Sequence, residues 1–90
     1  MDRVEVNPRI ARRHPEIRAD DVLHAWRNAI MLVERSADEA PDSLLVAAGF
    51  DSRGSLLEMV AVSTGIDSGH VFHAMTPPSK KTMKEMRWVR

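Results

Sequence analysis

The sequence predicts a small α+β domain, with two N-terminal helices and one C-terminal helix packed on an antiparallel sheet of three to four strands. Two observations lead to this prediction: an apolar helical stripe in the first third of the chain, and three short apolar segments separated by turns between residues 44 and 75. The 90 residues suit a single domain, 1–90, and contents of 43% hydrophobic and 29% charged residues exclude a disordered chain.

The first helix is predicted for Pro8–His14, after a very short strand at Val4–Val6. Asn7 is a good N-cap, proline fits the first helical position, and Pro15 disfavours helical geometry at the preceding residue.

The second helix begins at Ala19, with Asp20 and Asp21 in a first turn where the helix dipole favours acids. Its apolar stripe consists of Val22, Ala25, Trp26, Ala29 and Ile30. The two aspartates are expected to be solvated rather than to form a metal site, because adjacent helical residues point in different directions. A strand at Met31–Val33 and a loop at Ser36–Ser43 are expected next.

Three strands with short connections predict a meander over Leu44–Phe50, Ser55–Ser63 and His70–Met75. Asp51–Gly54 has Asp first and Gly last, as type I turns prefer. Glu58 is expected to face water on this sheet, with a general-base role as the alternative. Apolar residues of the helix and strands are expected to share one core: Val22, Trp26, Ile30, Phe50, Val60 and Phe72.

The last helix is predicted to start with Thr76 as its cap and Pro77 as its first residue. Met83 and Met86 then lie on one side. The opposite side is basic and carries Lys80, Lys81, Lys84 and Arg87. Such a face either keeps a surface helix solvated or contacts phosphates, and only Glu85 balances it.

Formal net charge is zero, so a nucleic-acid partner can be inferred only from local patches; a second one contains Arg9, Arg12, Arg13 and His14. The absence of cysteine excludes disulfides and thiolate chemistry, and no phosphate-binding glycine loop is present. Neither a signal peptide nor an apolar run long enough for a membrane span is visible, so we expect a cytoplasmic protein with no membrane partner.

Two of the four histidines suggest chemistry. His14 follows two arginines at a helix end, and His73 lies in the last strand before the basic helix. Two imidazoles flanked by cations could cleave RNA without a metal or cofactor, one as base toward the 2′-hydroxyl and the other as acid toward the leaving oxygen. Alternatively, His14 caps its helix and His73 bonds locally in a half-buried strand. His24 and His70 are expected to be solvated or structural, and two Phe, two Trp and no Tyr argue against base stacking.

Three segments together resemble the BrnT-type toxins of the RelE-like superfamily, over roughly residues 9 to 86: Arg12-Arg13-His14-Pro15-Glu16-Ile17, Gly49-Phe50-Asp51-x-Arg53-Gly54, and Val71-Phe72-His73-Ala74-Met75 leading into Ser79-Lys80-Lys81-Thr82. The resemblance implies a ribonuclease that arrests translation, neutralised by an antitoxin encoded nearby. Pro15 stands where the family usually has glycine, and Met75 where it usually has arginine.

The sequence therefore predicts the toxin of a type II toxin–antitoxin pair, an endoribonuclease with His14 and His73 as catalytic residues. RNA phosphates would be held by Arg12, Arg13, Arg53, Lys80, Lys81 and Lys84. Two alternatives stay open: a non-catalytic protein-interaction module with the toxin fold, and a small nucleic-acid-binding regulator.

Overall fold

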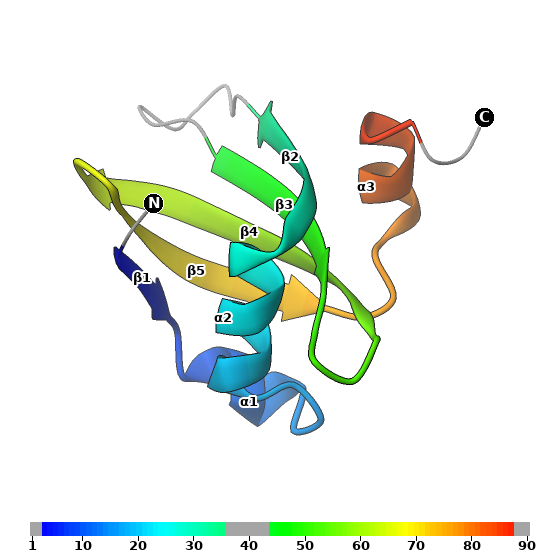
Figure 1. Cartoon of the computed structure of the whole chain (residues 1–90), viewed down its shortest axis with the longest axis horizontal. Coiled ribbons are helices and arrows are strands. Elements are labelled where there is room, and N and C mark those ends of the chain that lie inside the picture. Colours follow the sequence, from blue (N-terminus) through cyan, green and yellow to red (C-terminus); the bar gives the residue numbers. More distant parts are fainter. Residues whose placement is uncertain (1–2, 36–43, 88–90) are drawn as a thin grey trace.

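The computed structural model describes residues 3–35 and 44–87 as a sheet with helices on both of its faces (Figure 1). In chain order the elements are β1 (Arg3–Val6), α1 (Arg9–Arg13), α2 (Ala19–Arg27), β2 (Ala29–Arg35), β3 (Leu44–Phe50), β4 (Leu56–Gly65), β5 (Ser68–Met75) and α3 (Lys80–Glu85). The loop predicted for Ser36–Ser43 lies outside the described residues. None of the described helices is both long and apolar enough to cross a membrane.

The sheet is larger than predicted and mixed rather than antiparallel. Its five strands lie in the order β1-β5-β4-β3-β2, and β1 pairs parallel with β5 while the other neighbours are antiparallel. The parallel pair runs from Arg3 opposite Ser68 to Val6 opposite Val71. The prediction missed this pairing because four residues give little periodicity, and because their partner strand lies near the other end of the chain.

The predicted meander is confirmed for β3, β4 and β5. In the first hairpin the backbone N–H of Gly54 donates to the carbonyl of Asp51 at 3.1 Å, and Gly54 has a φ of 86°, a conformation that favours glycine. The Asp51 carboxylate accepts from the backbone N–H groups of Arg53 and Ser55, both at 2.9 Å. Asp51 thus fixes the turn through its side chain as well as its backbone.

Two buried clusters cover opposite faces of the sheet, since neighbouring β3 residues alternate between them. Ala47 belongs to the first cluster, beneath α1 and α2, whereas Val46 and Ala48 belong to the second, beneath α3. The first cluster is larger and includes Ile10, Ile17, Val22, Ala25, Leu57 and Met59. The second is small, with Val60 and Met86 as its other buried members. The α3 face of the sheet is therefore only partly covered.

The six residues predicted to share one core do not share it. Val22 and Val60 are buried, but in different clusters. Ile30 is 55% exposed because α2 ends at Arg27 and places Ile30 in the outer strand β2 instead of on the helical stripe. Phe50 and Phe72 are exposed, and Trp26 is only partly buried.

The last helix begins later than predicted. Ser79, not Thr76, is its N-cap, and the Ser79 hydroxyl accepts from the backbone N–H of Thr82 at 3.2 Å. The Thr76 hydroxyl instead donates to the carbonyl of Leu56 at 2.7 Å, which ties the chain after β5 to the start of β4. Met86 is buried against the sheet, and the three lysines of α3 are exposed.

We predict that Gly49→Ala destabilises the fold, because a Cβ at this position would overlap the backbone carbonyl oxygen of Ala25 in α2. Relief requires the helix to move off the sheet, so the free energy of unfolding in urea should fall by about 1–3 kcal/mol or more. Gly65→Ala is the matched control, because its Cβ would meet only the rotatable hydroxyl of Ser68. Equal stabilities of the two variants would contradict this close approach.

Candidate functional site

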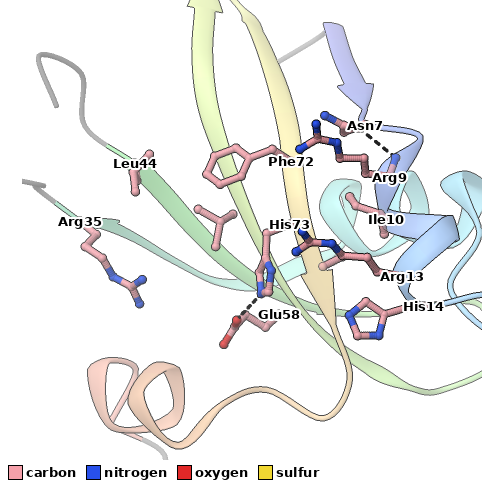
Figure 2. Close-up of a pocket in the computed structure, with 12 residues that line it drawn as sticks. Asn7, Arg9, Ile10, Arg13, His14, Arg35, Leu44, Glu58, Phe72 and His73 are labelled. Atoms are coloured by element: carbon pink, nitrogen blue, oxygen red, sulfur yellow. Dashed lines mark hydrogen bonds and ion pairs between the residues drawn. The ribbon is translucent and has the colours of Figure 1, made fainter.

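A cavity of about 530 Å³ lies on the α3 face of the sheet beside β4 and β5, and residues of α1, which packs against β5, complete its lining (Figure 2). This volume is in the range of small-ligand pockets, about 300–1,000 Å³. Its polar lining consists of Asn7, Arg9, Arg13, His14, Arg35, Glu58 and His73, and its apolar lining of Ile10, Leu44, Val60, Phe72 and Ala74. The catalytic pair expected from the sequence, His14 and His73, thus lines one cavity together with Arg13.

A β-bulge in β5 brings two consecutive side chains into this cavity. The register pairs Ala61 with Val71 and Val60 with His73, so Phe72 is an extra residue without a partner on β4. As a result Val71 and Ala74, three positions apart, both face the main buried cluster. Phe72 and His73 between them both line the cavity, which regular alternation would not allow.

Glu58 holds the ring of His73. Its carboxylate lies 2.8 Å from His73 Nε2, and its other oxygen accepts from the Ser79 hydroxyl at 2.7 Å and from the Ser79 backbone N–H at 3.1 Å. The prediction that Glu58 faces water is therefore wrong: the residue is buried at the base of the cavity. Its β4 position faces α3, and the segment before that helix covers it.

Burial alone would raise the pKa of the Glu58 carboxyl, but hydrogen bonds from Thr82, Ser79 and His73 outweigh it, and the net pKa is below the ordinary value of 4.5. Glu58 is therefore ionised at neutral pH and can only accept hydrogen bonds. His73 must then carry its proton on Nε2, which leaves the lone pair of the neutral ring on Nδ1. This tautomer can take up a proton at Nδ1.

The α1 side of the cavity supplies its positive charge. Arg9 and Arg13 are one helical turn apart and so share a face of α1. Neither forms an ion pair within residues 3–35 and 44–87. In Figure 2 the Arg13 side chain extends from α1 toward His73. These cations give the cavity an attraction for anions.

His14 follows α1 directly and caps it through its backbone, whose N–H donates to the carbonyl of Ile10 at 2.8 Å. Its ring is partly exposed, with Nδ1 3.5 Å from an exposed carboxylate oxygen of Glu16. The backbone thus fulfils the capping role considered for this residue, and His14 also belongs to the cavity lining.

Several cations predicted to bind phosphate lie elsewhere. Arg12, Lys80, Lys81 and Lys84 are exposed and do not line the cavity. Arg53 is also outside it, and its Nη2 donates to Asp21 Oδ2 at 2.9 Å and to the carbonyl of Glu16 at 2.8 Å.

The Arg53 contact also corrects the prediction for Asp21, which is buried rather than solvated. The same Oδ2 accepts from the backbone N–H of Arg18 at 2.9 Å, so Asp21 links the start of α2 to the hairpin. His24 is exposed, as predicted. His70 has a structural contact, since its Nε2 lies 3.3 Å from Asn7 Nδ2.

Sequence reasoning did not propose Asn7 or Arg35 as site residues, placed Phe72 in the core, and named Arg9 only as part of a basic patch. A signal existed for Arg9, whose spacing of four from Arg13 places both on one helical face. Arg35 comes from the outer strand and is paired with Glu85 at 2.9 Å, which connects β2 to α3 at the far end of the cavity. No local pattern indicates that contact.

The chain matches no known protein-family model, and no characterised protein or solved structure is significantly similar to it. Within the described residues, no group of three or more His, Cys, Asp or Glu side chains could hold a metal ion.

We predict that Glu58 stabilises the fold at neutral pH and loses this effect in acid. Its pKa is lower in the folded than in the unfolded chain, so its contribution is present above the ordinary pKa of 4.5 and is lost as the pH falls through the folded value. Glu58→Gln should therefore cost about 1–3 kcal/mol at neutral pH, and less in acid, in urea unfolding. Glu5→Gln, at an 84% exposed side chain, is the control. A Glu58→Gln cost that is the same at both pH values would contradict the prediction.

Proposed function

We propose that the chain is a metal-independent endoribonuclease that cleaves at this cavity, and that it is the toxin of a toxin–antitoxin pair. The observation that carries the proposal is that His14 and His73, far apart in the sequence, line one cavity with Arg9 and Arg13, which form no ion pair within residues 3–35 and 44–87. The resemblance to BrnT-type toxins points to the same activity.

The tautomer of His73 supports its assignment as the general base. Its Nδ1 would accept the proton of an RNA 2′-hydroxyl, while Glu58 holds Nε2–H and stabilises the imidazolium that results. The 2′-oxygen then attacks phosphorus and the bond to the 5′-oxygen breaks. Protonated His14 would donate a proton to that leaving oxygen. The products are a 2′,3′-cyclic phosphate and a 5′-hydroxyl end.

Arg9 and Arg13 are the groups best suited to the phosphate. Charge builds up on the non-bridging oxygens in the transition state, and guanidinium groups held beside them stabilise it. Arg12, Lys80, Lys81 and Lys84 would contact the RNA backbone on either side of the cleaved bond. Arg53 is left out, because its guanidinium is bonded to Asp21 and Glu16.

One observation favours the alternative of a protein-interaction module. Ile30 and Leu32 are 55% and 59% exposed on the outer strand β2, and exposed apolar side chains on an edge strand suit a protein partner. In the toxin proposal this strand is where an antitoxin could bind. Inducible expression in bacteria, with and without the neighbouring gene, separates the two: growth arrest relieved by the neighbour supports the toxin.

His14→Ala and His73→Ala are each expected to slow RNA cleavage by about 10²–10⁴-fold, because each removes a proton-transfer group. Both should also relieve growth arrest. His24→Ala, on the exposed side of α2, is the matched control and should cleave like wild type. Cleavage by the purified protein should continue in the presence of a chelator. A folded wild-type protein that leaves RNA intact would overturn the proposal.

Lys80→Ala and Lys81→Ala should act through binding alone. Each removes at most one phosphate contact, so the slope of log affinity against log salt should become shallower by about 0.7 per residue on single-stranded RNA. The maximal cleavage rate should be unchanged, since neither lysine lines the cavity. A drop in that rate with an unchanged salt slope would place these lysines at the reaction instead.

A further inference from the structure

Phe72 exposes an aromatic ring inside the cavity. Phe72 is 41% exposed and belongs to neither buried cluster, although its strand, β5, lies inside the sheet between β1 and β4. Val71 faces the main core, so the next side chain, Phe72, points to the other side of the sheet, and the bulge keeps His73 on that same side.

The surroundings of Phe72 combine apolar and cationic groups. Figure 2 shows the ring between Leu44 of β3 and Arg9 of α1, and all three line the cavity. Arg9 and Arg13 have no acidic partner in the described part of the chain, so this side of the cavity favours an anionic ligand. A flat apolar surface beside unpaired arginines suits a nucleotide, which carries a planar base next to its phosphate.

We infer that Phe72 is the stacking surface for an unpaired base of single-stranded RNA, next to the phosphate held by Arg9 and Arg13. This inference deepens the proposed function and rests on it. Stacking requires an open π-face, which a base inside a duplex does not offer, so the substrate class is single-stranded RNA. The small number of aromatic residues argued against stacking at the level of sequence, but one correctly placed ring is sufficient for one base.

The test measures binding apart from cleavage. A fluorescent single-stranded RNA with 2′-O-methyl groups lacks the attacking hydroxyl, so its affinity can be followed by anisotropy. Phe72→Leu keeps an apolar side chain and should weaken binding at least about 5-fold, whereas Phe72→Trp should retain or improve it. Phe50→Leu is the matched control, since Phe50 is 46% exposed but lies outside the cavity. It should bind like wild type.

Salt dependence distinguishes stacking from phosphate contact. Phe72→Leu should lower affinity equally at all salt concentrations, whereas Arg9→Ala and Arg13→Ala should make the salt slope shallower. An oligonucleotide with one abasic position at the cleavage site should bind wild type and Phe72→Leu alike, because the base that Phe72 contacts is missing. Equal affinity of wild type and folded Phe72→Leu for the intact RNA would overturn the inference.

The proposed function and this inference fail in different ways. If wild type binds the oligonucleotide with the expected Phe72 dependence but cleaves no unmodified RNA, the ribonuclease proposal fails and the stacking site stands. If wild type cleaves RNA and Phe72→Leu does so with unchanged affinity and rate, the stacking site is wrong and the ribonuclease proposal stands. Equal affinity for duplex and single-stranded RNA would also count against stacking.

Discussion

The buried carboxylate of Glu58 is the group on which the rest of the site depends. Removing an ionised carboxylate from water is costly unless hydrogen bonds replace its hydration, and here they come from three separate places. His73 belongs to the neighbouring strand, Ser79 is the cap of α3, and Thr82 lies one turn into that helix. Satisfying one charge therefore fixes the start of α3, closes the base of the cavity and orients a histidine.

The same contacts explain why the two faces of the sheet differ. The face beneath α1 and α2 holds the larger cluster of buried apolar side chains and carries most of the hydrophobic stabilisation. On the other face α3 is short and covers only part of the sheet, so polar side chains at Glu58 and His73 can be accommodated beside it. The bulge at Phe72 adds a second side chain to that open face without disturbing Val71 and Ala74 in the main cluster.

Local patterns in the sequence were sufficient for much of the fold. Leu44–Phe50 was predicted with its bounds correct, and the Asp51–Gly54 turn and the helix beginning at Ala19 are also as expected. What failed depends on contacts between distant residues. The bulge at Phe72 breaks the regular alternation of β5, and the buried carboxylate of Glu58 is hydrogen-bonded by Ser79 and Thr82, more than twenty residues further along the chain. The start of α3 was misplaced because Thr76 and Ser79 are both good caps, and the tertiary contact with Glu58 favours the second.

The net charge of zero conceals two groups of arginines, one paired with acidic side chains and one lining the cavity. Arg35 and Arg53 are engaged by Glu85 and Asp21, where they connect β2 to α3 and the β3–β4 hairpin to α2. Arg9 and Arg13 have no such partner in the described ranges, and they line the cavity. Since paired charges cancel locally, the field in the cavity is set by Arg9, Arg13 and the ionised Glu58 rather than by the total. A neutral chain can therefore present a cationic site, and the same argument explains why counting charges could not separate Arg53, which holds the fold together, from Arg13, which faces the cavity.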